Sequence, residues 1–177
     1  MRRTEWWRIV GLCVVSAVIY GVLFDQITAR ICVEYFTIGH PPVFGTVDPT
    51  TLGIGWGIIA TWWAGLLLGV PLAFAAQAGN RPKRDAASLV VPIVFLLAVM
   101  GLCALIAGVV GWLLSSRETV FLVGWLARAV PRDRHVPFLA DAWAHTTSYA
   151  VGFAGGCILI LRVWRSRGSG EPGTIGA

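Results

Sequence analysis

Charged side chains are scarce in this sequence. Asp, Glu, Lys and Arg make up 13% of the 177 residues, about half of their share in a typical soluble domain. Hydrophobic residues make up 56%. So few charges cannot cover the surface of a water-soluble protein of this size. We therefore expect lipid to replace water over much of the outside of the protein.

Paired cysteines and the common catalytic motifs are absent from the sequence. The four cysteines are Cys13, Cys32, Cys103 and Cys157. They have no paired spacing, so we interpret them as buried apolar side chains rather than as a disulfide framework or a cysteine-based zinc site. The sequence has no Walker A P-loop, no Gly-x-Ser-x-Gly elbow and no His-Glu-x-x-His motif. The chemistries that depend on these motifs are not predicted.

Long apolar stretches, in contrast, take up most of the chain. The four stretches lie at about residues 7–24, 52–78, 86–115 and 138–164. About 20 apolar residues in a helix cross the ~30 Å hydrocarbon core of a bilayer. We predict an all-α fold, a four-helix transmembrane bundle formed by one domain over residues 1–167, with the lipid bilayer as its partner. Residues 168–177 are Gly-rich and predict a disordered cytoplasmic tail.

The basic residues indicate an orientation. Nine of the fourteen lie at span ends that would share one side: Arg2, Arg3, Arg8, Arg81, Lys83, Arg84, Arg162, Arg165 and Arg167. Short cytoplasmic flanks are enriched in Lys and Arg, so we predict that both termini are cytoplasmic and that the first span is not cleaved. The net charge of +5 is then an orientation signal. No basic face is large enough to predict nucleic-acid binding.

Local signals refine this arrangement. Nothing in residues 25–34 breaks a helix, so the first helix is predicted to continue to Glu34. Asp48 is a predicted N-cap, with Pro49 at the first helical position. The apolar segment 119–130 is too short to cross a membrane and predicts a short interfacial helix before the fourth span.

Small residues recur at four-residue spacing in three of the spans. The stripes are Thr61, Gly65 and Gly69; Ala104 and Gly108; and Ser148, Gly152 and Gly156. Such stripes let helices approach closely, which drives helix association in lipid. They predict a compact bundle and, through the same faces, a homo-oligomer.

Polar residues gather at the predicted outer ends of the spans. Asp141 and His145 are four residues apart and share a helical face, so both can meet one ligand. They could bind a divalent metal or act as an acid–base pair. The alternative is structural, because a carboxylate in the first turn stabilises the positive end of a helix and can orient a histidine.

A second polar group lies after the first span. Arg30 and Glu34 are four residues apart and predict an ion pair. On a continuous helix, Asp25 and Glu34 face opposite sides. We therefore treat Asp25 as a separate polar group inside the bundle. The candidate site for zinc, iron or manganese then consists of Glu34, His40, Asp141 and His145.

Two segments carry a resemblance to a known family. They are DQITARICVEYFTIGHPP, residues 25–42, and GWGIIATWW, residues 55–63. The chain resembles a family of uncharacterised bacterial four-span integral membrane proteins, and the resemblance extends through Asp141 and His145. It implies a multi-pass protein of the bacterial inner membrane. The family has no assigned reaction, substrate or cofactor, so the resemblance transfers no catalytic residue.

Three functions are compatible with these observations. The first is a membrane protein with a structured polar site on the extracytoplasmic face that binds a metal, with or without enzymatic activity. The second is a transporter or channel subunit, although spans 2 and 3 have no charge in their apolar interiors, where an ion pathway usually shows one. The third is a non-catalytic scaffold or interaction protein.

Overall fold

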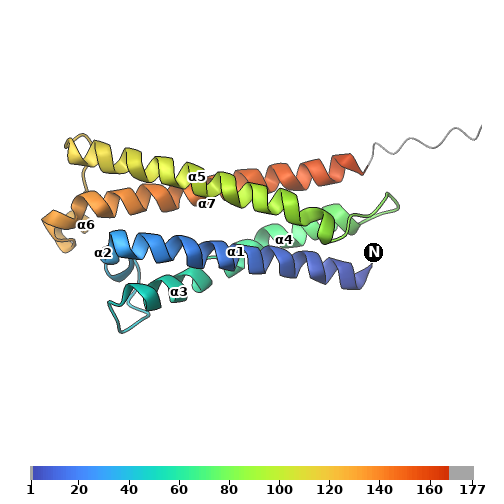
Figure 1. Cartoon of the computed structure of the whole chain (residues 1–177), viewed down its shortest axis with the longest axis horizontal. Helices are drawn as coiled ribbons and strands as arrows, with labels where there is room; N and C mark the ends of the chain where they lie inside the picture. Colours follow the sequence, from blue (N-terminus) through green and yellow to red (C-terminus); the bar gives the residue numbers. More distant parts are fainter. Residues whose placement is uncertain (1, 168–177) are drawn as a thin grey trace, which may run out of the picture.

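The computed structural model describes residues 2–167, and this part of the chain is helical without a strand (Figure 1). The helices are α1 (Arg3–Ile31), α2 (Val33–Thr37), α3 (Pro49–Ile59), α4 (Trp62–Gln77), α5 (Ala87–Ser116), α6 (Leu126–Ala129) and α7 (His135–Ser166), with a 3-10 turn at Arg132–Arg134. The predicted tail, 168–177, lies outside the described residues.

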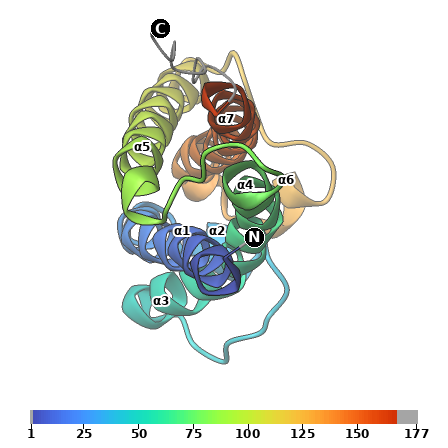
Figure 2. The same cartoon turned by 90° about the vertical axis from the view of Figure 1, so that its right-hand side faces the viewer.

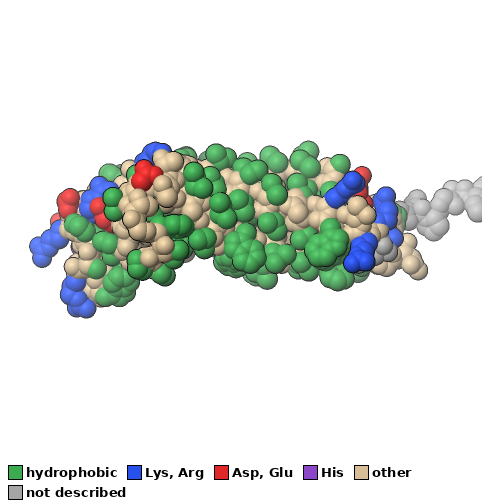
Figure 3. Space-filling model, turned by 90° about the horizontal axis from the view of Figure 1, so that it is seen from below, with side chains coloured by type: hydrophobic (Ala, Val, Ile, Leu, Met, Phe, Trp, Pro, Cys, Tyr) green, Lys and Arg blue, Asp and Glu red, His purple; other side chains and the backbone are tan. Residues whose placement is uncertain are grey.

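Four helical segments are long and apolar enough to cross a membrane, which confirms the predicted all-α four-span bundle. They cover Arg3–Ile31, Pro49–Gln77, Ala87–Ser116 and Arg132–Ser166. On the face shown in Figure 3, hydrophobic side chains cover the middle of the molecule and charged ones gather at its two ends. We call the end with Arg2, the loop 78–86 and Arg167 the terminal end, and the end with α2 and α6 the distal end (Figure 1).

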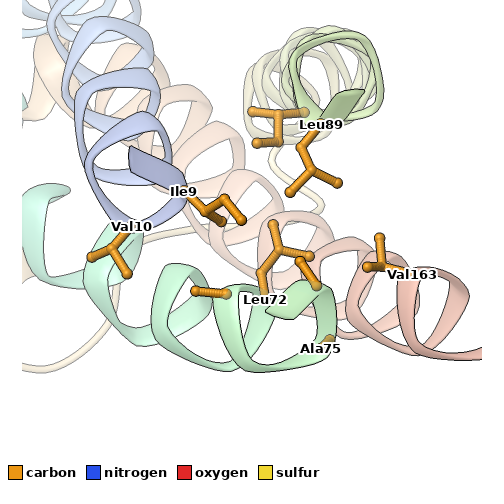
Figure 4. Packing of buried hydrophobic residues seen from close by; sticks show 9 residues of the cluster. Ile9, Val10, Leu72, Ala75, Leu89 and Val163 are labelled. Carbon is orange, nitrogen blue, oxygen red and sulfur yellow. The ribbon is translucent and has the colours of Figure 1, made fainter. Parts of the chain in front are cut away.

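The helices form two closely packed sets. α1 packs along α3 and α4, and α5 packs along α7, whereas α4 makes the main contact between the sets (Figure 2). Near the terminal end, a core of buried apolar side chains joins them (Figure 4). The two sets meet less closely between this core and the distal end, which leaves room for an internal cavity.

The second span is interrupted, which its continuous apolar run did not predict. α3 ends at Ile59 and α4 begins at Trp62. At the break the Thr61 hydroxyl donates to the Gly57 carbonyl oxygen at 2.5 Å, a local bond that competes with regular helix geometry. α3 therefore lies against α1 while α4 continues between α1 and α7 (Figure 2).

Glycines of the second span determine how closely it approaches α1. A Cβ added at Gly57 would lie 2.5 Å from the Val22 Cα, and one added at Gly65 would lie 2.7 Å from the Val14 Cα. Gly108, Gly152 and Gly156 likewise face neighbours within the chain. The small-residue stripes thus pack inside the chain, so the homo-oligomer stays a prediction that would need another surface.

The first helix does not continue to Glu34, and that prediction was wrong. α1 ends at Ile31, and Cys32 is extended with φ −146° and ψ 94°. Cys32 is fully buried and packs in a cluster with Val130 and Phe138. This tertiary packing outweighs the helical preference of the sequence and turns the chain across the distal end.

The helix predicted for residues 119–130 is mostly absent. Only Leu126–Ala129 is helical, because Glu118 and Gly124 adopt positive φ values of 54° and 64°. Leu122 and Val130 are buried in the distal cluster. In contrast, the Asp48 N-cap is confirmed, since its carboxylate accepts from the Thr51 amide at 2.7 Å.

Candidate functional site

A cavity of about 410 Å³ lies between the two sets of helices. Side chains of α1, α4, α5 and α7 line it. Toward the terminal end the lining is apolar and includes Leu72, Ile93 and Ile160, whereas Asp25 and His145 lie at the opposite end. The cavity is therefore mostly apolar, although Ser16 and Thr61 also line it, and its one carboxyl–imidazole pair lies at the end nearer α2.

Asp25 and His145 form a buried pair at this polar end. The His145 Nε2 lies 3.2 Å from the Asp25 Oδ1, and the residues are 7% and 5% exposed, respectively. The His145 Nδ1 lies 2.9 Å from the Asp141 carbonyl oxygen. A carbonyl oxygen can only accept, so Nδ1 carries a proton and Nε2 is the nitrogen that faces Asp25.

The sequence interpretation treated Asp25 as a separate polar group inside the bundle; the residue is buried there, and the structure adds that it lies beside His145. That interpretation rested on one continuous helix from Asp25 to Glu34, on which the two side chains face opposite ways. α1 is helical only to Ile31, and the inward face of this helix brings Asp25 to His145 on α7. A helix-face argument identifies which residues point inward, but it does not identify their partners on another helix.

A second polar contact lies one turn farther into the cavity, and sequence reasoning missed it. The Tyr20 and Ser148 hydroxyls are 2.8 Å apart and join α1 to α7. The Phe24 ring lies between the two contacts, 5.6 Å from the Tyr20 ring and 5.0 Å from that of His145. Tyr149 also lines the cavity. The sequence could have indicated Tyr149, because it lies four residues after His145 and residues at this spacing share a helical face.

Aromatic rings cover the polar end on its distal side. The Tyr35 ring centroid lies 4.6 Å from that of His145 and 5.0 Å from that of His40. His40 also packs against Trp56 at 4.6 Å, and its Nδ1 lies 2.8 Å from the Tyr35 carbonyl oxygen. Phe36 contacts both histidine rings. His40 thus belongs to an aromatic layer above the Asp25–His145 pair.

The predicted Arg30–Glu34 ion pair is absent, and both residues have other partners. Glu34 pairs with Arg134, with 2.9 Å between Oε2 and Nε. Arg30 donates to the Gln26 side chain and to the Thr50 hydroxyl, both at 2.8 Å. The helix break at Cys32 explains the change, because the four-residue spacing no longer puts Arg30 and Glu34 on one face.

Electrostatics at the distal end follow from this new pairing. Partial burial acts to raise the pKa of Glu34, but backbone hydrogen bonding and the bond from Arg134 outweigh it, so this pKa is lowered. Burial raises the pKa of the Cys32 thiol to about 12. Cys32 is thus a neutral thiol that donates to Glu34 at 3.4 Å.

The four predicted metal ligands are distributed over several environments. Glu34 is paired with Arg134, His40 lies in the aromatic layer, and His145 contacts Asp25. Asp141 is 1% exposed, and its Oδ2 has no hydrogen-bond partner in the described part of the chain. Within residues 2–167, no three His, Cys, Asp or Glu side chains form a group that could hold a metal ion. The divalent-metal site stays a prediction.

We expect the Asp25–His145 contact to stabilise the junction of α1 and α7. In a double-mutant cycle, Asp25→Ala and His145→Ala should be coupled by about 1 kcal/mol, because interhelical hydrogen bonds in lipid average about 0.6 kcal/mol and reach about 1.7 kcal/mol. Unfolding of the detergent-solubilised protein measures this coupling. A matched cycle of Asp25→Ala with Thr146→Ala, an exposed position on α7, should be additive. Additivity in both cycles would contradict the pairing.

Comparison of this chain with protein-family models, with curated proteins and with solved structures finds no match. The resemblance to uncharacterised bacterial membrane proteins therefore stays a prediction. Function has to be argued from the cavity and the side chains that line it.

Proposed function

We propose that this multi-pass membrane protein binds a single-chain amphiphile taken from the bilayer. The apolar chain of the ligand occupies the cavity, and its head group lies at the Asp25–His145 pair. The observation that carries this proposal is the amphipathic cavity itself, which combines a mostly apolar lining with the Asp25–His145 pair at one end.

The sides of the cavity support entry from lipid. Four of its lining residues are at least 45% exposed: Trp63 and Leu67 of α4, and Tyr149 and Phe153 of α7. They flank the level where the second span is interrupted and α3 turns away from α7. In a bilayer these exposed apolar side chains face lipid, so an amphiphile can enter between α4 and α7 without passing through water.

The volume of the cavity limits the size of the ligand. About 410 Å³ falls near the lower end of the roughly 300–1,000 Å³ typical of small-molecule sites. It suits one alkyl or isoprenoid chain rather than a whole two-chain phospholipid. The apolar lining contributes affinity by burying the chain, and the polar end orients it.

The orientation of the ligand follows from the orientation of the protein. The basic residues at the terminal end, the positive-inside pattern, support a cytoplasmic location for both termini. The polar end of the cavity would then lie in the extracytoplasmic half of a bacterial inner membrane. A protease added to intact spheroplasts should leave tags on both termini uncut. Cleavage of either tag before lysis would contradict this orientation.

Photolabelling tests the binding proposal directly. A diazirine-bearing fatty alcohol, activated by light in nanodiscs, should label α4 and α7 at the cavity opening, and unlabelled alcohol should compete. Ala64→Phe places a ring in the cavity lining and should weaken this labelling about tenfold, equivalent to about 1.4 kcal/mol.

The matched control is Ala154→Phe, which adds the same ring at an exposed position of α7 outside the lining. This variant should be labelled like the parent protein. The proposal fails if the label spreads evenly over the lipid-facing surface, or if Ala64→Phe and Ala154→Phe behave alike while both remain folded.

A further inference from the structure

The charge of the ligand's head group can be inferred from what the cavity lining contains. We propose that the amphiphile is cationic, a single-chain amine or quaternary ammonium. This inference rests on the proposed function and specifies the class of molecule that the same cavity takes. Three features of the lining carry it: the missing fixed positive charge, the buried Asp25 carboxyl group and the surrounding aromatic rings.

Fixed positive charge is missing from the cavity. Among the described residues that line it, none is Lys or Arg. His145 is the one lining residue whose side chain can become positive, and its Nε2 already faces the Asp25 carboxyl at 3.2 Å. An anionic head group would be buried without a partner, which costs several kcal/mol or more in an apolar environment. Phosphate, sulfate and carboxylate head groups are therefore disfavoured.

One carboxyl group lies at the same end. Asp25 lines the cavity, whereas Asp141, one helical turn before His145, is buried outside the lining. A cation placed beside Asp25 and His145 would be attracted by the Asp25 carboxyl group without opposition from a Lys or Arg of the lining.

Aromatic rings supply the remaining contacts for a cation. Tyr20, Phe24, Trp63, Tyr149 and Phe153 all line the cavity. The faces of such rings attract ammonium groups, and this attraction strengthens when the cation is removed from water. Tyr20 and Phe24 stack with 5.6 Å between their centroids, immediately beside His145. Quaternary ammonium groups are commonly recognised by cages of such rings.

A charge series tests this inference. Decyltrimethylammonium, decanol and decyl sulfate share one alkyl chain and differ in head-group charge. Each should compete with the photoreactive alcohol in phosphatidylcholine nanodiscs. The amount of each competitor that partitions into the bilayer is measured separately in nanodiscs without the protein, so that the competitors are compared at equal concentration in lipid. We expect the ammonium to compete at about one tenth of the concentration of decanol, a difference of about 1.4 kcal/mol, and the sulfate to be the weakest.

Two variants connect this preference to named side chains. Asp25→Asn keeps the size of the side chain and should remove the advantage of the ammonium while decanol still competes. Tyr149→Leu removes an aromatic ring at the opening, leaves the Asp25–His145 pair intact, and should reduce the advantage severalfold. If Asp25→Asn fails to fold, Tyr149→Leu still tests the inference.

The possible failures are distinguishable. If decyl sulfate or decanol competes as well as the ammonium at a site that Ala64→Phe weakens, the cavity binds amphiphiles and the cationic class is wrong. An ammonium advantage that persists in both Asp25→Asn and Tyr149→Leu would also overturn it. If none of the three competes and Ala64→Phe changes nothing, the proposed function itself fails.

Discussion

Replacement of Gly57 by Val is expected to separate α3 from α1 and to destabilise the protein by about 3 kcal/mol or more, the upper range for overpacking a dense interior. The Cβ of any residue at 57 would lie 2.5 Å from the Val22 Cα and 2.6 Å from the Val22 amide nitrogen. These are backbone atoms of a helix and cannot rotate away. Even Gly57→Ala should therefore be harmful, and Gly57→Val more so.

Gly11→Val is the matched control for this experiment. Gly11 also lies in a helix, α1, but nothing is within 4 Å of the position where its Cβ would be. Its substitution should change the stability by less than about 1 kcal/mol, as expected at a surface position. Thermal unfolding in detergent gives the comparison. Equal stability of Gly57→Val and Gly11→Val would contradict the close approach of α3 to α1.

The effect of Gly57 should extend to the cavity. Gly57 precedes the break at Ala60 and Thr61, and a Cβ added at Gly21 of α1 would lie 2.4 Å from the Thr61 Cγ2. The contact between α1 and the second span therefore helps to fix the position where α3 ends and α4 begins. A variant that separates them should also reduce photolabelling at the cavity opening.

The sequence was sufficient to predict the features that depend on composition along the chain. Four apolar stretches predicted the four spans, because a bilayer demands that length of apolar helix. The Asp48-Pro49 pair predicted the start of α3, because an N-cap depends on residues adjacent in sequence. Neither inference needed knowledge of which helix packs beside which.

The features that sequence reasoning missed depend on tertiary contacts. Cys32 ends α1 because it is buried against side chains about 100 residues away, such as Val130. Thr61 interrupts the second span where that span presses against Gly21. The Asp25–His145 pair spans 120 positions of sequence. No periodicity along a single helix encodes these contacts.

The candidate site was thus predicted in part. Asp141 and His145 lie one turn apart on α7, as expected, but the Asp141 backbone carbonyl oxygen rather than its carboxylate contacts the His145 ring. The carboxyl partner of His145 comes from α1 instead. A four-residue spacing suggested a metal site, whereas the arrangement of the bundle produced an amphipathic cavity with this histidine at its polar end.

Replacement of Arg167 by Ala is expected to be the most disruptive change at the terminal end. Arg167 entered the sequence analysis only as part of the basic flank, yet it is 3% exposed. Its guanidinium donates to the carbonyl oxygens of Pro82 at 2.7 Å, Ala78 at 2.6 Å and Arg81 at 3.2 Å, and also to that of Ala75. One side chain therefore satisfies carbonyl groups at the end of α4 and in the loop that follows.

The energetics of this contact are those of a buried, charge-assisted cap. Removal from water lowers the pKa of the Arg167 guanidinium, but the group stays charged, and the carbonyl oxygens around it stabilise this buried charge. Carbonyl groups at a helix C-terminus have no partners within the helix. Loss of Arg167 leaves several of them without their donor, and each buried acceptor left unsatisfied costs about 1–3 kcal/mol.

We therefore expect Arg167→Ala to lower the free energy of unfolding by about 2–4 kcal/mol, with partial compensation by water at the membrane surface. Arg167→Lys should recover only part of the loss, because one ammonium cannot match a planar guanidinium with five N–H donors. Arg165→Ala removes an exposed basic residue from the same turn and should be nearly neutral. If Arg165→Ala and Arg167→Ala destabilise the protein equally, positive charge in the flank matters and the cap does not. The separate contributions are measurable because the two variants change the net charge by the same amount.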